Sequence, residues 1–62
     1  MITDWEIEQL AKLLIYSYGD DAVREADLLI NFLRRQGDLD WPRIRLRLKP
    51  AIWRLRASPG ER

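Results

Sequence analysis

Two pairs of acidic residues are the part of this 62-residue chain whose types and spacing could do chemistry. Asp20 and Asp21 are adjacent, and Asp38 and Asp40 are separated by one residue. Paired carboxylates can act in acid–base catalysis or hold a cation. Each pair also follows a glycine that ends a predicted helix, where Asp is favoured as the cap of the next helix and by its dipole. We therefore interpret both pairs as helix caps.

Other residue types that catalysis or metal binding would need are missing. The sequence contains no His and no Cys, which removes the usual proton shuttle, the commonest metal ligand and any thiolate zinc site. The acids at 38 and 40 lack the longer ligand series and terminal Glu of a calcium loop. We predict that the protein is not an enzyme, with no catalytic, cofactor-binding or metal-binding residue and no small-molecule substrate.

Basic residues are concentrated near the C-terminus and could contact nucleic-acid phosphates. Residues 41–56 contain six of the eleven basic residues and no acid: Arg43, Arg45, Arg47, Lys49, Arg54 and Arg56. Residues 1–33 carry two basic and seven acidic groups (net charge −5), whereas residues 34–62 carry nine and three (net charge +6). Matched blocks of opposite charge favour pairing within the chain. A basic surface for nucleic acid or an acidic partner is the alternative.

The sequence predicts an all-α fold, a compact three-helix bundle with helices at about 3–18, 20–36 and 40–56. Residues 1–57 would form a single three-helix domain, followed by a flexible C-terminal tail at 58–62 that is rich in helix breakers. A chain of this length buries only about 60% of the surface that its unfolded form exposes. Its core therefore supplies no more than about 3–5 kcal/mol of stability.

Local signals mark the helix boundaries. Thr3 and Glu6 form a predicted capping box at the start of the first helix, and Gly19 and Gly37 follow the first two helices as left-handed C-terminal caps. Apolar residues recur at helical spacing in all three segments. The predicted core residues are Ile7, Leu10, Ala11, Leu14, Tyr18, Ala22, Ala26, Leu29, Ile30, Leu33, Ile44, Leu48, Ala51, Ile52 and Leu55.

Pro50 is the main obstacle to a regular third helix. Residues 43–48 alternate like a half-buried strand, but no second strand signal exists to pair with them, and helical spacing accounts for all of 41–56. A proline inside a helix removes one hydrogen bond and costs about 3 kcal/mol. We therefore predict that the third helix is kinked or split at Pro50.

Leu46, Pro50 and Trp53 would form an outward ridge on a regular third helix, between two basic rows. An apolar ridge with a basic rim is typical of a protein interface, whereas a DNA recognition helix presents polar side chains to the bases. In the alternative, Pro50 rotates the second half of the helix and returns Leu46 or Trp53 to the core. Trp5 and Tyr16 lie on the outer side of the first helix as further candidate contact residues.

The excess of large apolar side chains over a small core indicates an interaction module or adaptor. It would self-associate as a homodimer or bind a protein partner through Leu46 and Trp53, together with Trp5 and Tyr16. The alternative function is nucleic-acid binding by the basic flanks of the last helix. The N-terminus lacks the pattern of a secretory signal, and the longest uncharged run, 13–19, is too short to span a bilayer. We expect a cytoplasmic protein without a membrane partner.

Four short stretches resemble a family of short, uncharacterised bacterial helical proteins of unknown function. They are Asp4-Trp5-Glu6-Ile7, Tyr18-Gly19-Asp20-Asp21-Ala22, Gly37-Asp38, and Ala51-Ile52 followed by Leu55. The resemblance covers most of the chain and implies three helices, but it carries over no activity and no site. Pro50 departs from the pattern, since an ordinary helix former is expected there.

Overall fold

Helix accounts for almost the whole of the described chain. The computed structural model describes residues 1–57, and no strand occurs among them. The elements are α1 (Asp4–Tyr18), a 3-10 turn (Gly19–Asp21), α2 (Ala22–Gln36) and α3 (Trp41–Ala57). The all-α prediction is confirmed, and the helix boundaries lie within two residues of those predicted. The predicted C-terminal tail lies outside the described residues.

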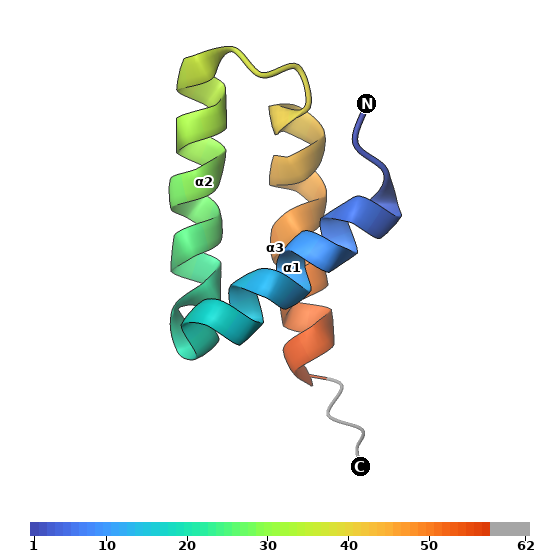
Figure 1. Cartoon of the computed structure of the whole chain (residues 1–62), viewed down its shortest axis with the longest axis vertical. Coiled ribbons are helices and arrows are strands. Elements are labelled where there is room, and N and C mark those ends of the chain that lie inside the picture. The colour runs from blue at the N-terminus through green and yellow to red at the C-terminus, as the bar shows by residue number, and fades with distance from the viewer. Residues whose placement is uncertain (58–62) are drawn as a thin grey trace.

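α1 and α2 are joined by the 3-10 turn without an intervening loop. The 3-10 turn follows the last residue of α1 and precedes the first residue of α2, so the chain stays helical from 4 to 36 and bends at the turn (Figure 1). The prediction of three separate helices is therefore wrong, because the chain forms two continuous helical segments, of which α3 is the second. Gly19 makes the bend possible, since its φ of 55° is a conformation that residues with a Cβ rarely adopt.

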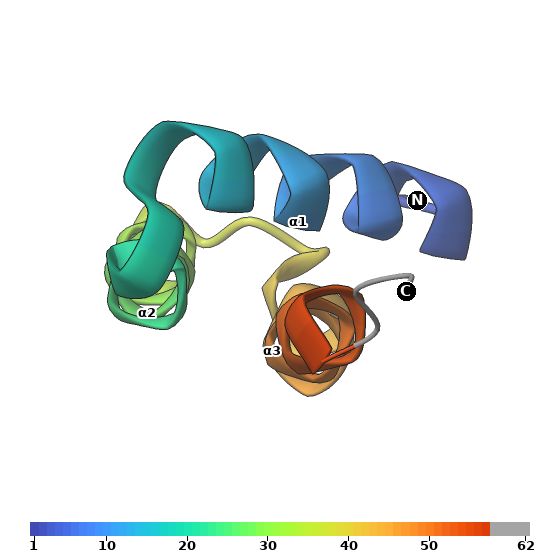
Figure 2. The ribbon, with the colours of Figure 1, turned by 90° about the horizontal axis from the view of Figure 1, so that it is seen from below.

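The core lies where α1 crosses the other two helices. α2 and α3 run antiparallel and side by side, and α1 lies across one face of both (Figures 1 and 2). Ten predicted core residues are buried: Ile7, Ala11, Leu14, Ala22, Ala26, Ile30, Ile44, Leu48, Ala51 and Ile52. The prediction for Tyr18 is wrong, because its side chain is 49% exposed at the end of α1. The Cα radius of gyration, 11.5 Å, is that of a compact fold.

Hydrogen bonds confirm two of the predicted helix boundaries. The Thr3 hydroxyl accepts from the Glu6 N–H at 3.1 Å, and the Glu6 carboxylate accepts from the Thr3 N–H at 2.8 Å. This reciprocal pair is a capping box. Gly37 is left-handed, with φ 73°, and the N–H of Asp38 donates to the carbonyl of Leu33 at 3.0 Å. These bonds end α2 in a Schellman motif.

The acids before α2 do not cap it as predicted. Asp21 occupies the N-cap position, but its side chain makes no cap hydrogen bond. The N–H of Ala22 instead donates to the carbonyl of Gly19 within the 3-10 turn. The chain therefore enters α2 from a backbone-bonded turn without a side-chain cap, and the carboxylate of Asp20 accepts from Arg56 instead.

α3 passes through Pro50 without a break. The predicted split is therefore wrong, and a kink stays a prediction. Proline leaves the carbonyl of Leu46 without its helical partner. Both residues are on the exposed side of α3, where water can satisfy that carbonyl. At the start of α3 the Asp38 carboxylate accepts from the N–H of Asp40 at 2.7 Å, which shapes the loop as an Asx turn.

Candidate functional site

The outer side of α3 presents an apolar ridge, which we define as Leu46, Pro50 and Trp53. Leu46 is 66% exposed and Trp53 is 60% exposed. Leu48 and Ile52, on the opposite side of the same helix, are fully buried. The alternative in which Pro50 returns Leu46 or Trp53 to the core is therefore wrong. The spacing of four and three residues along α3 brings the ridge together on one side.

The basic row between the α3 ridge and α1 is engaged by acids of α1. Arg43 donates to the Asp4 carboxylate at 3.1 Å, and Arg47 lies 3.6 Å from the other oxygen of the same group. Arg54 donates to Glu8 at 3.0 Å. All five side chains are partly exposed, and pairs of this kind contribute little each. Together they connect α1 to α3 where the two helices cross (Figure 1).

The second basic row faces α2 and the 3-10 turn. Lys49 donates to Asp27 at 2.9 Å and Arg56 to Asp20 at 2.6 Å. Within residues 1–57, Arg45 forms no ion pair. Five of the six basic residues of α3 are thus paired inside the described chain with acids of residues 1–33, as expected if the charge blocks pair with each other, although Arg45 and other members of both blocks are not paired there.

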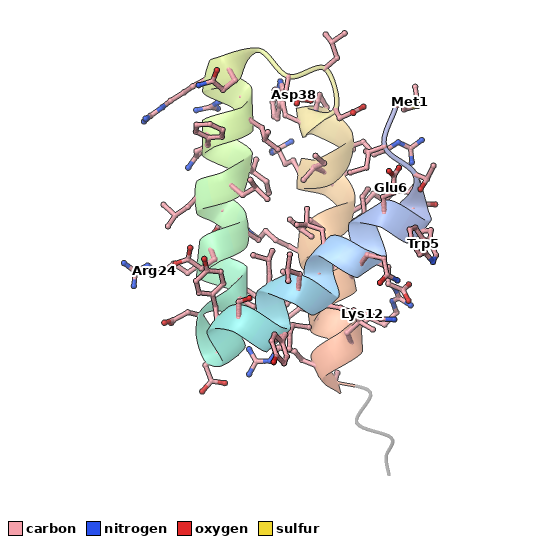
Figure 3. All side chains as sticks on the ribbon, in the orientation of Figure 1. Met1, Trp5, Glu6, Lys12, Arg24 and Asp38 are labelled. Carbon is pink, nitrogen blue, oxygen red and sulfur yellow. The ribbon has the colours of Figure 1, made fainter. Side chains whose placement is uncertain are left out.

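Trp5 and Tyr16 are 70% and 90% exposed, as predicted for the outer side of α1. Figure 3 shows Trp5 projecting at the N-terminal end of α1. Helix spacing places Asp4 and Glu8, with their pairs to α3, between this side of α1 and the α3 ridge. The four residues predicted for protein contact are therefore all accessible, but they form two surfaces rather than one.

Two shallow hollows border the α3 ridge. The hollow of about 300 Å³ between α1 and α3 is lined by Asp4, Ile7, Glu8, Arg47, Pro50, Ala51 and Arg54. The hollow of about 580 Å³ between α2 and α3 is lined by Asp27, Ile30, Asn31, Arg45, Leu46, Lys49 and Pro50. Both contain ion pairs between helices, so they widen the polar rim of the ridge.

A third hollow, the α1–α2 groove, is more apolar and was missed by the sequence analysis. It has a volume of about 450 Å³ and is lined by Leu10, Leu13, Leu14, Ser17, Tyr18, Glu25, Leu28 and Leu29. Leu13 and Leu28 are more than half exposed. The signal in the sequence was the width of the apolar face on both helices, which exceeds what a single core-facing stripe requires.

No described part of the molecule gathers metal-binding side chains. Across residues 1–57, no group of three or more His, Cys, Asp or Glu residues is placed to hold an ion. In the same residues, each helix is too short or too polar to traverse a lipid bilayer. The side chains that stand out in the described structure are therefore apolar ones on the surface.

Comparison with known proteins found no similar protein. No family model matches the chain, and neither a curated protein nor a solved structure matches it. The resemblance to short bacterial helical proteins stays a prediction.

Proposed function

We propose that this chain is a small protein-binding module that inserts the α3 ridge into an apolar groove of a partner protein. The observation that carries the proposal is the exposure of Trp53 and Leu46, 60% and 66%, on a helix whose other sides contact α1 and α2. An apolar patch that contains tryptophan and is surrounded by arginine has the composition of an interface hot spot. We also propose that the protein is cytoplasmic and of bacterial origin, as expected from the sequence.

The rim of the ridge indicates the chemistry of the partner. Five of the six basic side chains of α3 pair with four carboxylates of the chain, those of Asp4, Glu8, Asp20 and Asp27, and within residues 1–57 Arg45 pairs with none. The rim therefore keeps a positive excess after internal pairing. A groove with acidic residues at its edges complements this excess, which speeds association and excludes partners with basic edges.

Nucleic-acid binding has less support as a function. Five of the six side chains that would contact phosphates are already paired with carboxylates, and the centre of the face is apolar. Should all six contact phosphates, affinity for B-DNA would fall with salt at a log–log slope near −5. We expect no binding at low salt in a gel-shift titration with duplex DNA, and a slope of that size would favour this alternative.

Affinity capture with matched variants tests the protein-binding proposal. Full-length protein, Trp53→Asp and Leu39→Asp are each immobilised and exposed to lysate of the source organism. Leu39 is a suitable control because it is 95% exposed and lies in the loop before α3. We expect wild type and Leu39→Asp to retain the same protein and Trp53→Asp to lose it. Equal retention by all three would contradict a role for the α3 ridge.

A further inference from the structure

α2 carries an outward stripe that the fold of a single chain does not use. This α2 stripe consists of Glu25, Leu28, Phe32 and Arg35, at the three–four–three spacing of one side of a coiled-coil helix. Leu28 is 53% exposed and Phe32 is 56% exposed. Within residues 1–57, neither Glu25 nor Arg35 forms an ion pair. The stripe thus has an apolar centre and unpaired charges of opposite sign at its two ends.

The α1–α2 groove adjoins the centre of this stripe. Leu28 and Glu25 line the groove, and Leu13 of α1 forms part of its opposite wall. Phe32 lies one turn further along α2, beyond the lining of the groove. The chain therefore exposes an aromatic side chain next to an apolar hollow of about 450 Å³. Phe32 cannot fill the groove of its own chain, because it lies one turn beyond the groove along the same helix. Phe32 of a second copy can fill it.

We propose that two copies of this chain pair through their α2 stripes, with the two α2 helices antiparallel about a two-fold axis at the level of Ile30. This register sets Leu28 against Phe32 of the second copy and brings that phenylalanine to the level of the α1–α2 groove. The same register sets Glu25 opposite Arg35 of the second copy. Every contact occurs twice, as a closed two-fold interface requires.

Charge selects the antiparallel arrangement over the parallel one. In a parallel pair, Glu25 would face Glu25 and Arg35 would face Arg35, and like charges directly opposite each other are destabilising. In the antiparallel pair, Glu25 faces Arg35 of the other copy at both ends of the stripe. The two helix dipoles also point in opposite directions, which is favourable. The occupant of the stripe is therefore a second copy, since the stripe is complementary to itself.

This self-association is separate from partner binding. The α3 ridge is on a different helix and contributes no residue to the α2 stripe, so a dimer would present two ridges to its partners. Two linked ridges bind a partner with two grooves more tightly than one ridge does. The inference and the proposed function can therefore fail independently.

Sedimentation equilibrium of the full chain, from micromolar to millimolar concentration, tests the dimer. Leu28→Asp and Leu46→Asp are matched variants, since both replace a leucine that is more than half exposed on a helix. We expect Leu28→Asp to raise the dimer Kd by about tenfold or more and Leu46→Asp to leave it within about twofold. A monomer throughout that range would overturn the proposal. So would dimerisation that Leu46→Asp removes and Leu28→Asp spares, since the dimer would then use the α3 ridge.

Charge reversal tests the register. Glu25→Arg and Arg35→Glu alone each place like charges opposite one another and should weaken the homodimer by about tenfold. Their equimolar mixture should form a heterodimer of wild-type affinity, and the double variant should dimerise like wild type. Weakening by each single variant together with recovery in the double variant supports the antiparallel pairing. In a parallel pair the wild type already opposes like charges, so neither single reversal would weaken the dimer. A double variant as weak as either single variant would overturn the antiparallel pairing. Circular dichroism of each variant confirms that helix content is retained.

Discussion

The basic rows of α3 and the α2 stripe are both exposed and both charged, but their charges have different partners. Five basic residues of α3 reach carboxylates of α1, α2 or the 3-10 turn within 3.6 Å. Glu25 and Arg35 of the α2 stripe reach no opposite charge in the described residues. The rows of α3 therefore orient one chain's helices, whereas the α2 stripe is suited to contact between chains.

The same comparison holds for the apolar residues. The exposed side of α3 is a ridge between two hollows that contain ion pairs, whereas the α2 stripe borders a more apolar groove. A ridge fits a groove of a different protein, while a protruding Phe32 beside a groove fits a second copy of itself. Exposed apolar area alone does not distinguish these two roles. The surrounding charge and shape do.

The largest difference in the free energy of unfolding is expected between a leucine of the core and a leucine of the α2 stripe. Leu48→Ala removes a side chain with 0% exposure, and we expect a loss of about 2–5 kcal/mol in the free energy of unfolding. Such a loss approaches the entire stability of a chain this short. Leu28→Ala in the α2 stripe should change the free energy of unfolding by less than about 0.5 kcal/mol at concentrations where the chain is monomeric. Urea unfolding followed by circular dichroism measures both, and equal losses would show that the stripe belongs to the fold.

An intermediate effect is expected at the start of α1, which carries the acids that face α3. Thr3→Ala removes the hydroxyl that accepts from the Glu6 N–H, and should lower the free energy of unfolding by about 1 kcal/mol. Thr3→Ser keeps the hydroxyl and should restore most of that loss. Thermal unfolding at one protein concentration compares the three proteins. Equal melting temperatures for Thr3→Ala and wild type would show that this cap does not stabilise α1.

The smallest effect is expected for the ion pairs of α3 themselves. Asp4→Asn removes the carboxylate shared by Arg43 and Arg47 and should lower the free energy of unfolding by about 0.2–1 kcal/mol, because the pairs are largely exposed. High salt should shrink this difference, since it screens exposed charges. Glu25→Gln should leave the stability of the monomer unchanged. Urea titrations at low and high salt measure these differences, and an equal loss for Glu25→Gln would remove the contrast between the two regions.

Most of the fold was predictable from short-range signals. The capping box at Thr3 and the left-handed Gly37 depend on neighbours within a few residues, and helical spacing identified the ten buried side chains. The wrong predictions concern contacts between residues far apart in the sequence and the way in which two neighbouring helices join. Asp20 pairs with Arg56 across the molecule, and the two helices around Gly19 merge through a 3-10 turn. Neither outcome can be read from the few residues around it.

The candidate surfaces divide in the same way. The α3 ridge was predictable because helix spacing alone places Leu46 and Trp53 opposite the core of one helix. The α1–α2 groove was not, because Leu13 and Leu28 come from different helices. Their proximity depends on the angle at which α1 crosses α2. Trp5 and Tyr16 were correctly placed outside, but their separation from the α3 ridge depends on how α1 lies against α3.

The amino-acid sequence by itself determined where α1 begins and α2 ends, which side of each helix is apolar, and that the chain has an acidic and a basic block. These properties follow from hydrogen bonds, backbone conformation and side-chain spacing within a few turns of one helix. Only the tertiary structure decided which carboxylate meets which arginine, and which charges and apolar side chains remain without a partner. Those outcomes depend on distances between helices, and such distances are set by the packing of the whole chain around Leu48 and Ile52.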